Sequence, residues 1–134
     1  MRLLKTLTNL ITEAAPPDDV QDSIRKKKVI TINYDGEEYG RGYRDIEPVC
    51  FGFTKKGEPV LRAWERQGAS HSKVTRDNPI PGWRFFKLAK ILTYLPQGDT
   101  FTEVRPGYNP NGDKLMSRVI LNATFDDNEE ENIT

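Results

Sequence analysis

The sequence predicts a mainly β domain of the α+β class, folded as a small, strongly bent sheet or a partly open barrel. The segment VITINY at residues 29–34 alternates β-branched or apolar residues with polar ones, as in a half-buried strand. Clear helical spacing precedes residue 28, and short strand-like runs separated by turn residues then recur as far as residue 125. At 134 residues the chain suits one domain, which we place at residues 1–125.

Two helices are expected before the first strand. A stripe of apolar residues at helical spacing predicts the first over residues 1–15, and the two prolines that follow end it. The stripe consists of Leu3, Leu4, Leu7, Leu10 and Ile11. Such a helix is only marginally stable alone in water, so the stripe packs either on the chain's own sheet or on a second copy or another partner. Asp18 can cap a second, shorter helix that turns Val20 and Ile24 inward.

Two strands with a tight reversal between them follow VITINY. RDIEPVCFGF and PVLRAWERQ predict strands at residues 44–53 and 59–67, joined by a turn at KKG. Pro48 has no backbone donor, so we expect it at a sheet edge or a bulge. The run GASHSKVTRDNPIPG at residues 68–82 is a long polar loop, and its length makes it a candidate functional loop.

The remaining segments predict the end of the sheet. WRFFKLAKILTYL is interpreted as a strand or turn leading into ILTYL, with a short helix over residues 86–91 as the alternative. TFTEVRPGY and KLMSRVILNATF predict a final strand pair at residues 100–108 and 114–125. The dipeptide Asn111-Gly112 in the loop between them is a common tight-turn signal.

Charged residues cancel over the whole chain, 20 basic against 20 acidic, but the two signs are segregated. Residues 126–134 hold five acidic residues and no basic one, and their low hydrophobicity predicts a disordered tail. Residues 1–125 therefore have 20 basic against 15 acidic residues, a net charge of +5. Between Arg41 and Lys90 the balance is 11 to 5. This asymmetry indicates a face that binds a polyanion and an acidic tail that can screen it.

Few side chains suit catalysis or metal binding. Cys50 is the single cysteine, which excludes an intramolecular disulfide and a multi-cysteine zinc site, and we expect it to be a small buried hydrophobe in a strand. His71 is the single histidine, and its neighbours Ser70, Ser72 and Asp77 have no spacing diagnostic of a nucleophile or base. No phosphate-binding loop or dinucleotide motif is present. We therefore expect no enzyme, no metal and no cofactor.

The N-terminal apolar stretch is interrupted by Lys5, Thr6, Thr8 and Asn9. This pattern is typical of neither a secretion signal nor a membrane-spanning helix. We therefore expect a cytoplasmic protein without a membrane partner.

Short motifs spread between residues 24 and 101 resemble the WYL domain family. YDG, RDIEP and WRFFKLAKI stand where that family has a Tyr-ending strand, an Arg-x-x-x-Pro element and a closing Phe-Arg-Leu-x-x-Ile element. The matching residues are Tyr34, Arg44, Pro48, Arg84, Phe86, Lys87, Leu88 and Ile91. The Trp-Tyr-Leu triplet that names the family would lie in PVLRAW, where Leu61 matches but Pro59 and Val60 replace the aromatic pair.

The resemblance implies an Sm-like, SH3-type five-stranded barrel. It also implies a regulator of the kind found in bacteria and phages, which senses or binds nucleotides and single-stranded nucleic acid. Family members usually carry a helix-turn-helix domain as well, whereas this chain has no room for one and no convincing basic recognition helix. By this resemblance the chain is a standalone accessory protein, encoded by a phage and acting in the host cytoplasm.

Basic and aromatic residues share the faces of the predicted strands. In PVLRAWERQ, Arg62, Trp64 and Arg66 lie on one face, because alternate residues of a strand point the same way. An indole between two guanidinium groups can stack on bases while the arginines bind phosphates. The alternative is that Trp64 packs beneath the N-terminal helix and the arginines extend to solvent.

Other basic residues extend the candidate nucleic-acid or anion site. Arg44 and Arg84 would form an anion pocket if they converge, unless Arg44 pairs internally with Glu47 or Asp45. The remaining basic candidates are Arg41, Lys73, Arg76 and Lys87. Tyr108, at the tip of a loop, is either a second stacking site or a hydrogen-bonded loop tyrosine.

We therefore expect a non-catalytic accessory or regulatory module that binds single-stranded nucleic acid or a nucleotide. One alternative is a protein-interaction module that modulates transcription, repair or virion assembly through the leucine stripe and the acidic tail. A second alternative is a sensor of a small anionic ligand that binds at Arg44 and Arg84.

Overall fold

The structure of the protein is a computed structural model that describes residues 15–36, 40–68, 82–112 and 114–125. Its elements are α2 (Pro17–Arg25), β1 (Lys28–Gly36), β2 (Gly40–Phe53), β3 (Pro59–Gly68), β4 (Gly82–Lys87), the 3₁₀ helix η2 (Leu88–Lys90), β5 (Ile91–Thr100) and β6 (Arg118–Asn122). The predicted helix over residues 1–15 with its leucine stripe, the loop that holds His71 and the acidic tail lie outside the described residues.

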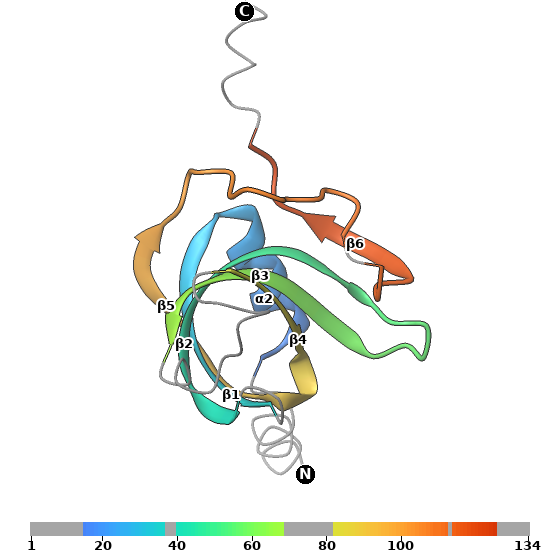
Figure 1. The fold of residues 1–134 in the computed structure, drawn as a ribbon, viewed down its shortest axis with the longest axis horizontal. Coiled ribbons are helices and arrows are strands. Elements are labelled where there is room, and N and C mark those ends of the chain that lie inside the picture. Colours follow the sequence, from blue (N-terminus) through green and yellow to red (C-terminus); the bar gives the residue numbers. More distant parts are fainter. Residues whose placement is uncertain (1–14, 37–39, 69–81, 113, 126–134) are drawn as a thin grey trace, which may run out of the picture.

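The six strands form one antiparallel sheet, which confirms the mainly β prediction. Five strands follow the order β4-β3-β2-β1-β5, and β6 pairs with the second half of β2, beyond the part that pairs with β1. The sheet curves strongly about its inner face (Figure 1). In the described part of the chain β4 and β5, at the two ends of this order, do not pair, so the sheet is not closed into a barrel.

β2 pairs with different strands along its length because it is long and carries a bulge. The register between β2 and β3 shifts between Pro48 and Cys50. The residue left out of the register is Val49, and a bulge interrupts the ladder locally, which is where a strand tolerates a neighbouring proline. Pro48 therefore lies at the bulge of a central strand, directly before Val49, and a bulge was one of its two expected places.

The reversal between β2 and β3 is the tight turn predicted at KKG. The backbone N–H of Thr54 donates to the Glu58 carbonyl at 2.9 Å, and that of Gly57 donates to the Thr54 carbonyl at 2.8 Å. Gly57 has a φ of +86°, a conformation that glycine adopts without strain. The turn is therefore fixed by its own backbone.

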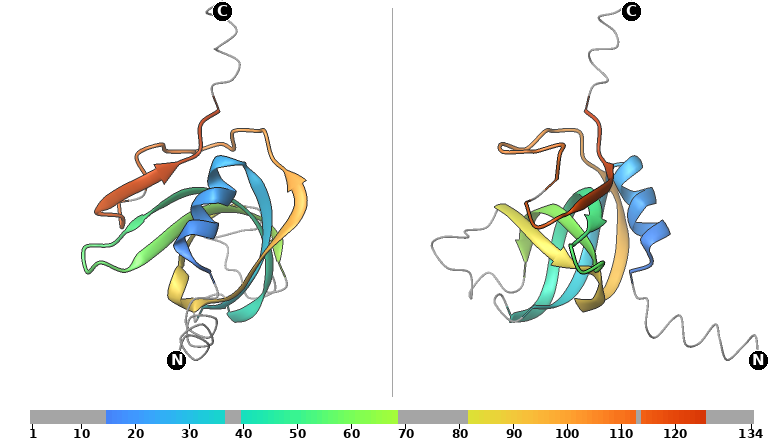
Figure 2. Two further views of the ribbon diagram at one scale, coloured as in Figure 1. Left: turned by 180° about the vertical axis from the view of Figure 1, so that it is seen from behind. Right: turned by 90° about the vertical axis from the view of Figure 1, so that its right-hand side faces the viewer.

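α2 lies against β1, β2 and β6 and covers one side of the curved sheet (Figure 2). Val20 and Ile24 are fully buried, as their spacing predicts. The helix begins differently from the expectation, because Pro16 occupies the capping position and Asp18 lies in the first turn. An acidic residue there still interacts favourably with the helix dipole. Within the described ranges, no helix has the length and apolar character needed to cross a membrane.

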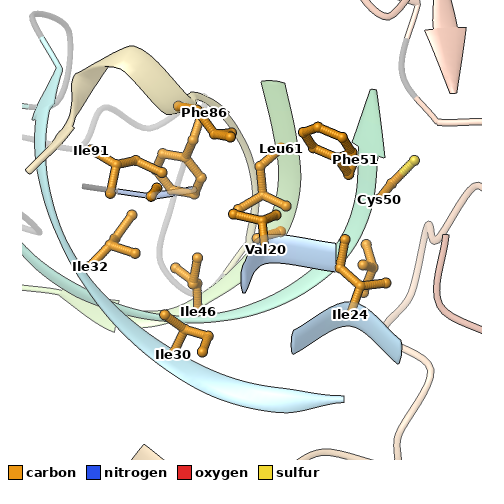
Figure 3. Packing of buried hydrophobic residues seen from close by; sticks show 14 of the residues in the cluster. Val20, Ile24, Ile30, Ile32, Ile46, Cys50, Phe51, Leu61, Phe86 and Ile91 are labelled. Carbon is orange, nitrogen blue, oxygen red and sulfur yellow. The ribbon is translucent and has the colours of Figure 1, made fainter. Parts of the chain in front are cut away.

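The apolar core lies between α2 and the inner face of the sheet (Figure 3). Its largest fully buried apolar side chains are those of Ile24, Ile30, Ile32, Ile46, Phe51, Leu61 and Phe86. Cys50 is also fully buried, with its Sγ 3.7 Å from the Met116 Sδ, so it is the small buried hydrophobe that its sequence context predicts.

The predicted strand pair at residues 100–108 and 114–125 is wrong. β6 pairs with β2 instead, and residues 101–112 pass over the outside of the sheet without forming a strand; we call residues 101–112 the strap. Two prolines and two glycines interrupt the strap, which explains why it forms no ladder. The predicted turn is present, since the N–H of Gly112 donates to the Asn109 carbonyl at 3.0 Å.

The ambiguous segment WRFFKLAKILTYL forms β4, one turn of 3₁₀ helix and the first half of β5. The strand leading into ILTYL is therefore correct, and the helical alternative is limited to the three residues of η2. This short turn redirects the chain from one end of the sheet order to the other.

Candidate nucleic-acid interface

β3 and β4 turn buried side chains inward and basic or aromatic side chains outward, as strand alternation predicts. The six outward residues, which we call the β3–β4 face, are Arg62, Trp64, Arg66, Trp83, Phe85 and Lys87. The register pairs Arg62 with Phe85 and Trp64 with Trp83, so cations and rings are neighbours across the two strands. Arg66 is exposed and the other five are half-buried.

The two tryptophans of this face are already in contact with cations. Their rings meet edge to face with centroids 5.3 Å apart. The Arg62 guanidinium lies 5.2 Å from the Trp83 ring, and the Arg105 guanidinium of the strap lies 5.5 Å from the Trp64 ring. Trp64 therefore lies on the outer face, beside Trp83 and the strap, and a base that stacked on it would compete with Arg105.

Of the two alternatives for Tyr108, a stacking site for a base and a hydrogen-bonded loop tyrosine, the structure shows the second. The Tyr108 hydroxyl donates to the Ala123 carbonyl at 2.5 Å, and its ring stacks on Trp83 with centroids 6.2 Å apart. Burial raises the pKa of Tyr108 to about 12. The Trp83 Nε1 also donates to the Pro106 carbonyl at 2.7 Å, so ring contacts and hydrogen bonds together hold the strap against the sheet.

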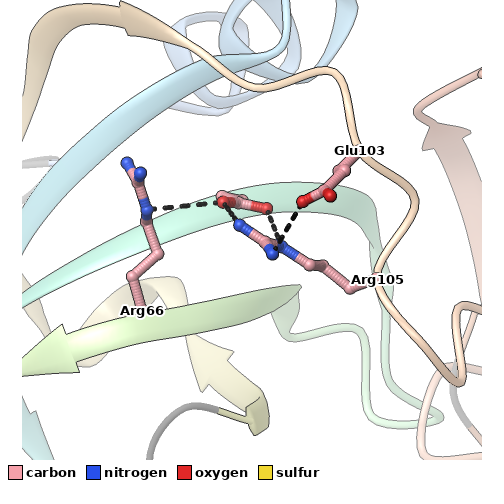
Figure 4. A network of polar contacts seen from close by, with 4 residues as sticks. Arg66, Glu103 and Arg105 are labelled. Atoms are coloured by element: carbon pink, nitrogen blue, oxygen red, sulfur yellow. Dashed lines mark hydrogen bonds and ion pairs between the residues drawn. The ribbon is translucent and has the colours of Figure 1, made fainter.

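An ion-pair network centred on Glu47 joins the strap to β2 and β3 (Figure 4). Arg105 donates to both carboxylate oxygens of Glu47, from its Nε at 3.0 Å and from its Nη2 at 2.7 Å. The Arg66 Nε lies 3.4 Å from the same carboxylate, and Glu103 accepts a bond from the Arg105 Nη1 at 3.0 Å. Glu47 is only 1% exposed. Its ion pair with Arg66 partly neutralises the charge of Arg66, which weakens Arg66 as a candidate phosphate ligand.

The structure brings Arg44 and Arg84 together, but it places them in the interior. Both are buried, and the buried Glu65 lies between them, 3.6 Å from the Arg44 Nη1 and 3.1 Å from the Arg84 Nε. Burial lowers the pKa of Arg44 and raises the pKa of Glu65. Arg44 thus pairs with Glu65, a partner that the sequence did not indicate, and the two buried arginines do not form an anion pocket open to solvent.

The residues that carry the family resemblance lie close together around this buried group. The Arg44 guanidinium is 5.6 Å from the Tyr34 ring, and the Tyr34 and Phe86 rings meet edge to face at 4.8 Å. The Tyr34 hydroxyl accepts a hydrogen bond from the Lys87 backbone N–H at 3.0 Å. These contacts join β1, β2 and β4 on the inner side of the sheet.

Three predicted site residues cannot be placed, because Lys73, Arg76 and the side chain of Arg41 lie outside the described residues. The structure also brings together residues that the sequence did not indicate. Lys55, Lys56 and Lys114 border a groove beside Phe85, although they come from separate segments. The two adjacent lysines of the turn were the one sequence signal that could have indicated this groove. The signal is weak, because charged turns are also common as ordinary solvent-exposed surface.

Among the described residues, no three His, Cys, Asp or Glu side chains form a group that could hold a metal ion. Comparison of the chain with protein-family models, with curated proteins and with solved structures found no match in any of the three. Function is therefore inferred from the geometry of the β3–β4 face.

Proposed function

We propose that the protein is a non-catalytic accessory or regulatory module that binds single-stranded nucleic acid across the β3–β4 face. The observation that carries the proposal is the composition of this face, where every solvent-accessible outward side chain that the structure describes is basic or aromatic. The acidic residue of the same stretch, Glu65, is turned inward. Interleaved cations and rings are what a single strand requires, because it presents phosphates and unstacked bases together.

Arg62, Phe85 and Lys87 are the centre of the proposed interface. Phe85 is the cross-strand neighbour of Arg62, and Lys87 is the next outward residue of β4. The two cations would bind phosphates, while the half-buried Phe85 ring offers a stacking surface. A stacked base contributes about 1–3 kcal/mol. Trp64 and Arg66 contribute less to binding, because the Trp64 ring already contacts Arg105 and the Arg66 guanidinium is already paired with Glu47.

We further propose that the bent sheet is an open form of an Sm-like, SH3-type barrel, and that the chain is a WYL-like module. The support is the mutual contact of Tyr34, Arg44 and Phe86, three of the residues on which the resemblance depends. The aromatic pair that names the family is replaced by Pro59 and Val60. The ligand is therefore assigned from the β3–β4 face and not from the family.

The proposal is tested by fluorescence titration with short single-stranded DNA and RNA over a range of salt concentrations. Removing one phosphate ligand lowers the slope of log K against log salt by about 0.7 for a single strand. We expect Arg62→Gln to lower the slope by this amount and to weaken binding. Tyr43→Ala is the matched control, because Tyr43 is 54% exposed on β2 outside the face. Absence of binding at low salt, or binding without a salt slope, would contradict the proposal.

A protein-interaction module is the second candidate, and the edge strand β5 favours it. β5 pairs only with β1 among the described residues, and it exposes Leu92 (40%) and Leu95 (54%). An exposed edge with apolar side chains can accept a strand from another chain. Light scattering of the wild type and of L92S/L95S tests this candidate, since a dimer present only in the wild type would support it and two monomers would not.

A further inference from the structure

A groove lies at the end of the β3–β4 face, where three segments distant in sequence meet. The turn between β2 and β3 supplies Lys55 and Lys56, β4 supplies Phe85 and Lys87, and the chain before β6 supplies Lys114 and Leu115. Its volume is about 530 Å³, within the range of about 300–1,000 Å³ that is typical of ligand sites. Phe85 belongs both to the groove and to the proposed interface, so the two surfaces are continuous.

The groove carries an excess of positive charge. Among the residues that the structure describes, four lysines line it against one acidic residue, Glu58. Glu58 pairs with Lys87 at a long distance of 3.8 Å, and both side chains are nearly half exposed, so this pair neutralises little. Lys55, Lys56 and Lys114 form no ion pair within the described part of the chain. Three cations are therefore available to an anionic ligand.

The backbone around the groove is held in place without a ligand. The turn is closed by its two backbone hydrogen bonds, and the Thr54 hydroxyl accepts a further bond from the Glu58 N–H at 3.1 Å. The Ser117 N–H donates to the Phe53 carbonyl at 2.8 Å and fixes the third segment to β2. A preformed site loses less conformational entropy when it binds its ligand.

The chemistry of these side chains suits a phosphate backbone that carries bases. An ammonium group is a compact point charge on a flexible stem, so lysines can bind phosphates in many positions along a mobile strand. The Phe85 ring and the exposed apolar Leu115 add surfaces for a base or a sugar. This combination suits a flexible polyanion that also presents flat rings.

We propose that this groove binds phosphates of the same single strand that crosses the β3–β4 face, so that the strand continues from Arg62 past Phe85 to the lysines. The inference rests on the proposed function and extends it to a site formed by the turn and the chain before β6. It assigns roles to Lys55, Lys56 and Lys114, which the alternation of the strands does not indicate.

The test is fluorescence anisotropy of a labelled twelve-nucleotide oligothymidine with the full-length protein, at several salt concentrations. The variant K55Q/K56Q/K114Q removes three phosphate ligands, so we expect the salt slope to fall by about 2. At 0.1 M salt this change corresponds to a loss of affinity of about 100-fold. The matched control is R25Q/K26Q/K28Q, which also removes three positive charges. These residues lie at the end of α2 and just after it, on the side of the molecule away from β4 (Figure 2).

The control variant should keep the wild-type slope. Equal losses in the two triple variants would overturn the groove while leaving the proposed function intact, because long-range charge alone would then explain them. A wild type that fails to bind oligothymidine at low salt would overturn the proposed function as well. Tighter binding of a poly-glutamate peptide of equal charge would overturn the nucleic-acid assignment. A thermal melt of each variant establishes that it is folded.

Phe85→Leu gives an independent measurement, because it keeps an apolar side chain and removes the ring. We expect it to weaken oligothymidine binding by about tenfold, within the range for loss of one stacked base, and to leave the salt slope unchanged. Unchanged affinity in this variant would overturn the continuous path through Phe85.

Discussion

The carboxylate of Glu47 provides the sharpest test of how the strap is held on the sheet. Replacing it by the isosteric amide in Glu47→Gln keeps the shape of the side chain and removes its charge. The buried carboxylate accepts two hydrogen bonds from Arg105, at 3.0 and 2.7 Å, but only one long contact from Arg66, at 3.4 Å. The two arginines should therefore differ in how much stability each derives from Glu47.

The expected cost follows from the geometry of the two pairs. A hydrogen bond to a charged group contributes about 1.5–3 kcal/mol to stability, so the two bonds from Arg105 correspond to about 3–6 kcal/mol. This figure is an upper limit, because water can replace Glu47 as a partner of Arg105 in the variant. The Arg105 side chain is 26% exposed and an amide oxygen still accepts one bond, which reduces the expected cost of Glu47→Gln to about 2–3 kcal/mol. The Arg66 side chain is 43% exposed, and its pair with Glu47 should contribute less than about 1 kcal/mol.

Urea unfolding of a double-mutant cycle separates the two contributions. The coupling energy between Glu47→Gln and Arg105→Gln should be about 2 kcal/mol, whereas that between Glu47→Gln and Arg66→Gln should be below about 0.5 kcal/mol. The melting temperature of Glu47→Gln should be lower than that of the wild type by about 6–18 °C, since 1 kcal/mol shifts a domain of this size by about 3–6 °C. Equal coupling of the two arginines, or coupling to Arg105 below about 0.5 kcal/mol, would refute the reasoning.

Three further predictions concern the strap, the interior and the alkaline range. Gly112→Ala should cost about 2–3 kcal/mol in unfolding free energy, because its φ is +88° and a Cβ would lie 2.7 Å from a valine methyl, whereas Gly98→Ala, at φ +93° in open space, should cost about 1 kcal/mol. Glu65→Gln should cost about 3–5 kcal/mol in urea unfolding, because it leaves two buried arginines without their carboxylate, against less than about 0.5 kcal/mol for the half-exposed Glu58→Gln. The pKa of Tyr108 is raised to about 12, so the unfolded chain ionises first and stability should fall between about pH 10 and 12; Tyr108→Phe should flatten that part of the pH profile.

Alternation along the strands is the part of the structure that the sequence predicts best. It places Arg62, Trp64 and Arg66 on one face of β3 because a strand has no other way to orient consecutive side chains. The proline beside the bulge and the glycine turn at KKG were also predictable from residue type, since proline lacks a backbone N–H and glycine adopts a positive φ without strain.

Tertiary pairing is what the sequence could not supply. The strap begins within the alternating run TFTEV, whose pattern predicts a strand, but its position is decided by Arg105 and Trp83, which bind it to the outside of the sheet. The lysines of the groove come from segments about 60 residues apart, and no local pattern joins them. Alternation assigns Glu65 correctly to the opposite face from Trp64, yet nothing local indicates that it meets two arginines there.

The buried arginines and the proposed interface are two consequences of one register. On β3 the inward residues end in Glu65 and the outward residues include Arg62 and Arg66, so a shift of the strand by one residue would exchange the two sets. Such a shift would bury guanidinium groups beside Arg44 and Arg84 and would expose the carboxylate that now lies between them. Because an uncompensated buried charge costs several kcal/mol, the pairing at Glu65 penalises the shifted register far more than an apolar residue would. We therefore expect Glu65 to specify which face of β3 carries the basic and aromatic side chains, and thus to position an interface that it does not touch.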